Sequence, residues 1–176
     1  LTEYLQQDGM AYRLVPIRTP GTPGGDLGRI DSDYLYDKLM NTFRYGNLRD
    51  TTVNADIFVR NTVFSSQLYT TAHRLANQLL DEGDTIRARQ VLSHILQELP
   101  PKQIGVDYAF PELIYALYNA GMEQEGKALL EFTKKNGIEY MDYFATLSPA
   151  EARAISRKME EQLYIIYNLY MIGKAV

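Results

Sequence analysis

Arg74-Leu-Ala-Asn-Gln-Leu-Leu-Asp-Glu-Gly83 is the stretch that decides the fold, because its pattern returns 38 residues later in the chain. The second copy is Glu112-Leu-Ile-Tyr-Ala-Leu-Tyr-Asn-Ala-Gly121. Each copy has apolar residues at helical spacing and ends on a glycine, which adopts the left-handed backbone of a helix end at little cost. A second apolar run follows each glycine, so each unit is predicted to be two antiparallel helices with Gly83 or Gly121 in the turn.

A single pair of helices cannot bury its apolar face alone, so such units stack on one another. The sequence therefore predicts an all-α fold over residues 31–176, made of antiparallel helix pairs in an α-α superhelix. Asp31 is expected to cap the first helix, and Gly46-Asn47 to end it as a turn. A long helix is expected from about Ala55 to Glu82, where apolar residues form a stripe of helical period.

Residues 1–30 differ in composition from the rest of the chain. Met10 to Ile17 predicts an extended run, and Arg18 to Arg29 is rich in proline and glycine, which prevents a helix or a strand. No Gly-Lys-Ser/Thr follows these glycines and they fit no dinucleotide fingerprint, so a surface loop is favoured over a phosphate loop. We expect one domain, with this irregular and partly extended segment packed on the helices or leading into them.

The first unit resembles a tetratricopeptide repeat. Leu75 and Ala76 match the Leu-Gly pair of the first helix in that repeat. Ala88 matches the small residue of the second helix, where the two helices approach closely. Other residues that fit the pattern are Leu79, Gly83, Leu92, Ile95 and Pro100.

The second unit departs from that repeat in three places. Gly126 stands where the small alanine belongs, and Thr133 replaces an apolar residue. Asn136-Gly137 is expected to end the helix in place of proline. The offset of 38 residues also exceeds the usual length of about 34. The resemblance implies tetratricopeptide-like rather than regular repeats.

The last element has a clear start. Ser148-Pro149-Ala150-Glu151 is a capping box with proline at the first helical position, and the helix is expected to run to about Ile172. Ile165, Leu169 and Gly173 repeat the spacing of the leucines and the glycine in the first unit. This element is interpreted as the first helix of a third unit whose partner is missing or is supplied elsewhere.

Composition excludes several classes of function. The net charge of −4 argues against nucleic acid as a partner, because nucleic-acid binding needs a concentrated basic surface. The absence of cysteine excludes disulfides and thiolate chemistry. The chain starts at Leu1 without a signal segment, so we interpret it as part of a longer protein. Its most apolar stretch, Leu163 to Ile172, is shorter than the roughly 20 residues that cross a bilayer.

No catalytic, cofactor-binding or metal-binding residue is predicted, so this chain is not expected to be an enzyme. His73 and His94 could approach each other on paired helices but lack further ligands at metal-site spacing, so surface or helix-edge positions are expected. The acidic groups are expected to face solvent, beside turns or on polar helix faces. They are Asp81-Glu82-Asp84, Glu123-Glu125 and Glu160-Glu161.

Tyrosine is the one unusual component, with 14 in the chain and a concentration of them in its C-terminal half. A tyrosine combines an apolar ring with a polar tip, which suits packing between helices, a peptide groove or a surface that stacks on sugars. All three alternatives remain open at this point. The predicted binding surface consists of Tyr108, Tyr115, Tyr118, Tyr164 and Tyr167.

A second resemblance covers nearly the whole chain. It is carried by the runs Asp8 to Pro16 (Asp-Gly-Met-Ala-Tyr-Arg-Leu-Val-Pro) and Asn41 to Asn47, together with Leu75-Ala76 and Gly83. These residues resemble the C-terminal region of a bacterial family of multi-spanning membrane proteins of unknown function. That family is similar to GT-C type glycosyltransferases and to animal protein O-mannosyltransferases that end in a tetratricopeptide-like tail.

This resemblance implies a domain on the periplasmic side of the cytoplasmic membrane, next to the membrane portion of its own parent chain. The catalytic residues of the family belong to the membrane portion, so none is carried onto this chain. The implied partners are that membrane portion and a protein or peptide, such as a glycosylation acceptor. The alternative is an independent tetratricopeptide scaffold without any link to glycosylation.

The alignment of the first unit makes a test of its own. Replacing Ala88 with leucine should overpack a close contact between helices and lower the free energy of unfolding by about 1–3 kcal/mol. Urea denaturation of the two proteins measures the difference. An unchanged denaturation midpoint would show that Ala88 does not hold the close-contact position.

Overall fold

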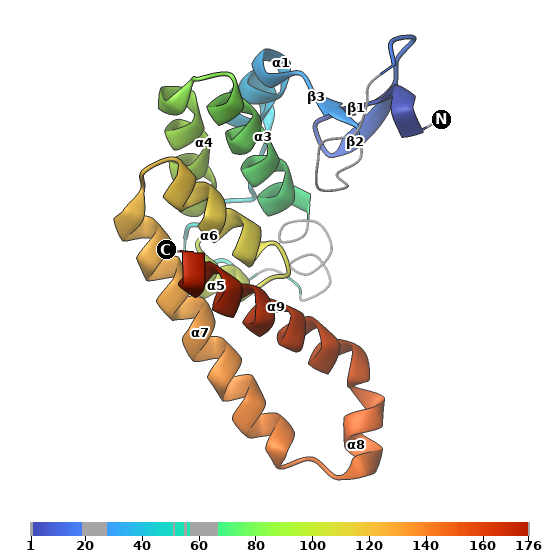
Figure 1. Cartoon of the computed structure of the whole chain (residues 1–176), viewed down its shortest axis with the longest axis vertical. Coiled ribbons are helices and arrows are strands. Elements are labelled where there is room, and N and C mark those ends of the chain that lie inside the picture. Colours follow the sequence, from blue (N-terminus) through green and yellow to red (C-terminus); the bar gives the residue numbers. More distant parts are fainter. Residues whose placement is uncertain (1, 19–27, 51, 55, 57–66, 176) are drawn as a thin grey trace.

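The computed structural model describes residues 2–18, 28–50, 52–54, 56 and 67–175. These residues form a mostly helical fold in which helices pack in pairs, with a small three-stranded sheet at the N-terminus (Figure 1). The glycine- and proline-rich stretch that the sequence predicts as a loop falls largely on residues 19–27, outside the described residues.

The N-terminal sheet adds a β component to the predicted all-α class. Strand β1 (Leu5–Asp8) pairs antiparallel with β2 (Ala11–Leu14) and parallel with β3 (Arg29–Ile30), so the strand order is β2-β1-β3. Gly9 makes the hairpin turn with a φ of 70°. The extended run predicted from Met10 is therefore one strand of a hairpin. Its pairing with β1, and the pairing of β1 with β3, were not predicted.

A buried polar network fastens this sheet to the helices. The Gln7 side chain donates to the Thr71 hydroxyl at 2.9 Å, and Arg74 donates to the Gln7 amide oxygen at 2.5 Å. Arg74 also donates to the carbonyl of Gly28 at 3.0 Å and to the hydroxyl of Tyr12 at 3.2 Å. Because a buried guanidinium is costly unless it is hydrogen-bonded, these contacts fix where the sheet lies on the helix that carries Arg74.

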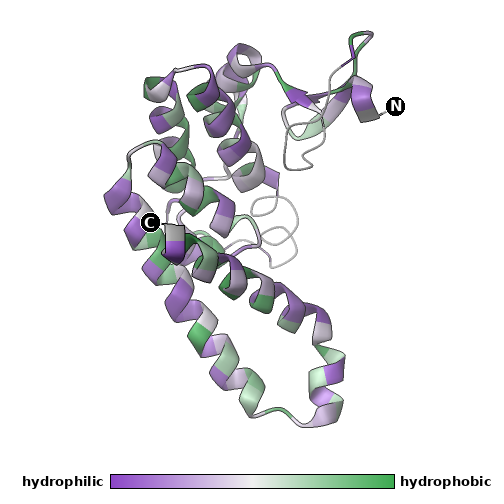
Figure 2. Cartoon of the chain, in the orientation of Figure 1, coloured by the Kyte–Doolittle hydropathy of each residue, from purple (hydrophilic) through white to green (hydrophobic). Residues whose placement is uncertain are grey.

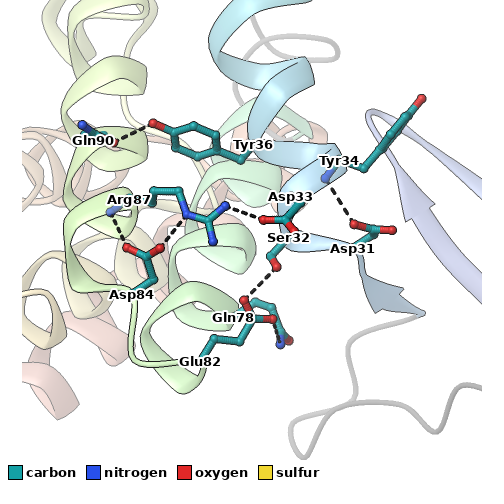
Figure 3. Close-up of polar contacts among 10 residues, drawn as sticks. All are labelled: Asp31, Ser32, Asp33, Tyr34, Tyr36, Gln78, Glu82, Asp84, Arg87 and Gln90. Carbon is teal, nitrogen blue, oxygen red and sulfur yellow. Dashed lines mark hydrogen bonds and ion pairs between the residues drawn. The ribbon is translucent and has the colours of Figure 1, made fainter.

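A second polar cluster joins the first helix to the turn at Gly83 (Figure 3). Arg87 donates to Asp84 at 2.6 Å and to Asp33 at 2.5 Å, and its guanidinium lies 5.5 Å from the centre of the Tyr36 ring. These two carboxylates raise the pKa of Arg87 further, with Asp33 the larger cause. As predicted, Asp31 caps α1 (Ser32–Asp37) by accepting from the amide of Tyr34. A π-helical turn, η2 (Lys38–Thr42), continues α1.

The two predicted helix pairs are present, and both glycine turns are confirmed. Gly83 and Gly121 have φ values of 83° and 69° between consecutive helices. Of the long helix predicted from about Ala55, the structure describes the part that begins at Thr70; Asp56 is not helical, and residues 57–66 lie outside the described part of the chain. The helices of the pairs are α3 (Thr70–Asp81) with α4 (Thr85–Glu98), and α6 (Phe110–Asn119) with α7 (Glu123–Ala145).

The pairs stack through their first helices. α6 packs against α3, and α9 (Ser156–Ala175) packs against both α6 and α7. Between the pairs lies the short α5 (Pro101–Ile104). Green segments of the ribbon in Figure 2 lie where α3, α4, α6 and α7 face one another, which marks a single apolar core running through the stack.

An arginine from the first pair caps the first helix of the second pair. The Nε of Arg89 donates to the carbonyl of Ala120 at 2.6 Å, next to the turn at Gly121. A Cβ at Gly121 would lie 2.8 Å from an Arg89 guanidinium nitrogen, so this glycine supplies space as well as a positive φ. The contact couples the two units and satisfies a carbonyl at the end of α6.

The predicted helix end at Asn136-Gly137 is wrong, because α7 continues through both residues to Ala145. Gly137 is buried in this helix, and a Cβ there would lie 3.0 Å from a side-chain carbon of Ile166 on α9. The glycine therefore lets two helices approach closely and does not end one. Thr133, which replaces an apolar residue, is fully buried and donates its hydroxyl to the carbonyl of Leu129 at 2.7 Å.

The last helix is interrupted, contrary to the sequence prediction of one helix to about Ile172. Ser148 and Glu151 form the predicted capping box of α8 (Pro149–Ala154), but the chain leaves helical geometry at Ile155. The break turns α9 back along α7 (Figure 1), where Ile165 and Leu169 are buried. Burial of that face outweighs helix continuity. α9 then runs past Gly173, which is helical and not a turn.

The close approach of α7 and α9 gives a stability test with a matched control. Gly137→Leu should lower the free energy of unfolding by about 1–3 kcal/mol, because the new side chain overpacks the contact with Ile166. Gly173→Leu should not lower it and should gain up to about 1 kcal/mol, because a Cβ at Gly173 meets no atom within 4 Å and leucine favours a helix. Urea denaturation compares them. Equal loss in both variants would contradict the close contact.

Candidate functional site

Two candidate binding surfaces lie on opposite sides of α9. Two residues along a helix turn it by about 200°, so Tyr164, Asn168 and Met171 lie opposite Ile166 and Tyr170. The first group faces the neighbouring helix α6, and the second faces α7. We call these surfaces the tyrosine seam, between α6 and α9, and the apolar groove, between α7 and α9.

The tyrosine seam contains a hollow of about 260 Å³. Tyr115 from α6 lies on one side of it and Asn168 from α9 on the other. Its remaining lining residues are Pro111, Glu112, Met171 and Ile172. An aromatic ring, an amide and a carboxylate in one shallow hollow suit contact with a polar chain rather than a buried apolar ligand.

A stacked pair of tyrosines closes one end of the seam. The rings of Tyr108 and Tyr164 have centroids 4.4 Å apart and planes inclined by 12°. A hydrogen bond between the two side chains, with some burial, raises the pKa of Tyr164 to about 12. Tyr164 is therefore neutral at physiological pH, and the pair presents two rings stacked on each other.

The structure brings together three of the five tyrosines predicted as a binding surface. Tyr108, Tyr115 and Tyr164 lie along the seam. Tyr118 instead lies on the side of α6 that faces α7, where a Cβ at Gly126 would be 3.2 Å from its ring. Tyr167 is 60% exposed and points away from both neighbouring helices.

The apolar groove, of about 490 Å³, was not predicted from sequence. One wall belongs to α7 and the other to α9, and two lysines are the charged residues among the described residues that line it. The spacing of Leu130, Lys134 and Ile138 was the available signal, because it marks one helix face. That signal was lost when Gly137 was interpreted as a helix end. The groove is lined by Leu130, Lys134, Ile138, Met141, Ile166, Leu169, Tyr170, Gly173 and Lys174.

The histidines lie away from both surfaces. His73 is only 7% exposed, so the expected surface position is wrong for it, and His94 packs edge-on against the Tyr45 ring at 5.3 Å. Across the described residues, no three His, Asp or Glu side chains lie together in a way that could hold a metal ion. Of the acidic groups, Asp84 has a structural part, because it caps α4 and pairs with Arg87.

Comparison with protein-family models, with curated proteins and with solved structures finds no match to this chain. Within the part of the chain that the structure describes, no helix combines the length and the apolarity needed to cross a membrane. The candidate function therefore follows from the chemistry of the tyrosine seam and the apolar groove.

The stacked pair makes a titration test. Tyr108→Phe removes the hydrogen-bond partner and should lower the pKa of Tyr164 from about 12 toward its ordinary value of 10. NMR of tyrosines labelled at the ring carbon that bears the hydroxyl measures that pKa. Tyr115→Phe is the control and should leave it unchanged.

The same pair affects stability at high pH. Because the folded pKa of Tyr164 exceeds its unfolded value near 10, its stabilising contribution is complete below pH 10 and is lost as the pH rises through 12. The loss of stability over this range should be smaller in Tyr108→Phe. An unchanged Tyr164 pKa in that variant would show that the hydrogen bond is not its cause.

Proposed function

We propose that this chain is a non-catalytic, tetratricopeptide-like domain that binds an extended polypeptide along the tyrosine seam. The arrangement of helices supports this proposal. α6 packs against α3 on one side and against α9 on the other, while α4 and α7 are the second helices of their pairs. Stacked pairs of this kind create an extended surface that suits an extended ligand.

The observation that carries the proposal is the way α3 holds an extended part of its own chain. Thr71 and Arg74 on α3 contact Gln7 of β1, and Arg74 also holds the backbone carbonyl of Gly28. By the 38-residue offset, the position of Arg74 corresponds to that of Glu112 on α6. Glu112 lines the seam, and there Tyr115 is 47% exposed. A second extended chain would lie on α6 as the N-terminal sheet lies on α3.

The side chains of the seam fit such a ligand. The rings of Tyr108 and Tyr164 offer flat apolar contact to proline, aromatic or aliphatic side chains. Asn168 donates to the carbonyl of Tyr164 at 2.8 Å, and its amide oxygen is an acceptor suited to a backbone N–H. Shallow and largely polar contacts of this kind favour weak binding, in the micromolar range or poorer, equivalent to about −8 kcal/mol or less in magnitude.

The resemblance to the membrane family supports the rest of the proposal. In this hypothesis, the domain lies on the periplasmic side of the membrane, beside the membrane portion of its parent chain. A protein glycosyltransferase must hold its acceptor, and binding energy away from the reacting atoms improves reaction there. The competing hypothesis is an independent scaffold, favoured by the fact that the tyrosine seam needs no membrane partner for its contacts.

Binding to the seam can be measured with an unfolded polypeptide, such as reduced and carboxymethylated serum albumin, by calorimetry. Tyr115→Ala should weaken binding by at least about threefold, because it removes an exposed ring that makes no hydrogen bond among those described. Tyr143→Ala is the control, because this ring is 52% exposed on α7, away from the seam. Equal affinity in the wild-type chain and Tyr115→Ala would exclude the seam as the binding site.

The glycosylation hypothesis needs the full-length parent protein. Deletion of this domain should reduce transfer to protein acceptors more than transfer to a small acceptor. Equal loss of both, with the protein still present in the membrane, would show that the domain only supports the enzyme. A parent without membrane segments would leave only the independent scaffold.

A further inference from the structure

The apolar groove occupies a defined place in the internal repeat. The spacing that relates Leu113 and Gly121 to Ile165 and Gly173 is 52 residues. The same offset relates the groove residues on α9 to residues of α6 and of the turn that follows it. The pairs are Ile114 with Ile166, Leu117 with Leu169, Tyr118 with Tyr170, and Gly121 with Gly173.

In the second unit, a helix covers this face. Ile114 and Leu117 are fully buried, and the ring of Tyr118 packs against the backbone of α7 at Gly126. The first unit has the same arrangement, with Ala76 and Leu79 of α3 fully buried in the pair that α3 forms with α4. On α9, the equivalent face is covered only in part: Leu169 is buried and Ile166 lies against Gly137 of α7, whereas Tyr170 is 57% exposed and Gly173 has no atom within 4 Å of a Cβ position.

We infer that the apolar groove binds an amphipathic α-helix of a partner protein, seated on α9 as α7 is seated on α6. The lining of α7 runs from Leu130 to Met141, which corresponds to about 17 Å of helix and to three turns of a ligand. The ligand helix carries an apolar stripe with a small residue opposite Tyr170, in the place that Gly126 takes against Tyr118.

The chemistry of the lining selects a helix over an extended chain. Leu130, Ile138 and Ile166 contribute no hydrogen-bonding side-chain atom, so an extended backbone would lose water there without gaining partners. A helix satisfies its own backbone. It needs only an apolar stripe to enter the groove, and the open position at Gly173 lets its backbone come close.

The charges select an acidic helix. Lys134 lies on the α7 wall, where it also pairs with Glu131 at 3.1 Å, and Lys174 lies on the α9 wall with its ammonium 4.5 Å from the centre of the Tyr170 ring. Carboxylates that flank the apolar stripe of the ligand would complement both lysines. A symmetric pairing of two copies of this chain through the same face would bring the lysines of one copy close to those of the other. Repulsion between these like charges disfavours a second copy as the occupant.

The test uses the whole 176-residue chain and two labelled helical peptides of 15 residues, followed by fluorescence anisotropy. Both peptides carry a leucine and isoleucine stripe with a central alanine; one has flanking glutamates and the other has lysines in their place. We expect the glutamate peptide to bind at least tenfold more tightly than the lysine peptide. Gly173→Leu, which fills the groove, should weaken the affinity for the glutamate peptide at least tenfold. Lys174→Glu should reduce the ratio of affinities between the glutamate peptide and the lysine peptide.

Two controls keep this test separate from that of the tyrosine seam. Tyr167→Ala changes an exposed ring on α9 outside the groove, and Tyr115→Ala changes the seam, so both should leave affinity for the glutamate peptide unchanged. Equal affinity for the two peptides, or no effect of Gly173→Leu on peptide affinity in a protein whose urea midpoint is not lowered, would overturn the inference. A concentration-dependent dimer that Gly173→Leu abolishes, seen by sedimentation, would also overturn it by showing that a second copy fills the groove.

Discussion

Each helix pair in this chain, taken alone, leaves one apolar face uncovered. The packing of the pairs on one another follows from the need to bury that face. α4 buries one side of α3, but α3 buries its remaining apolar residues only when α6 packs beside it. The same holds for α6, which needs α9. Because the burial of apolar surface is the dominant favourable term in folding, the units are stable as a stack and not one by one. A stack of this kind always has two ends, and the two ends of this chain differ.

The N-terminal end is closed by α1 and η2, whose Leu35 and Leu39 are fully buried, and by a sheet that polar contacts hold on α3. Arg74 is buried on α3, and its guanidinium donates to Gln7, to Tyr12 and to the carbonyl of Gly28, which reach it from the sheet and the residue before β3. Removing one partner from such a network leaves a buried polar group unpaired, which costs about 1–3 kcal/mol, and more for a charge. The network therefore specifies where the sheet lies. At the other end of the stack, α9 and α7 leave apolar side chains partly uncovered, and these side chains line the apolar groove.

The helix pairs were predictable because their signals are local. Apolar spacing and a glycine 38 residues apart marked Gly83 and Gly121, and the capping box at Ser148 marked the start of α8. Gly137 was misinterpreted because a glycine can either adopt a positive φ at a helix end or let two helices pack closely. The close neighbour Ile166, which is distant in sequence, shows that the second role applies here. The hairpin and the break at Ile155 depend on contacts with distant elements. The tyrosines were found as a group, but the side of α6 or α9 on which each lies depends on how the helices pack.

α9 is common to both candidate surfaces, and this sets how ligands at them can influence each other. Ile165 and Leu169 hold α9 in place, so undocking of this helix would destroy the tyrosine seam and the apolar groove together. A ligand at 100 times its Kd on either side stabilises the docked state by about 2.7 kcal/mol. A second ligand gains affinity from the first only to the extent that the undocked state was populated beforehand. With α9 firmly docked, the two sites act independently; when substitutions such as those at the contact between Gly137 and Ile166 loosen it, each ligand strengthens binding of the other by suppressing the same open state.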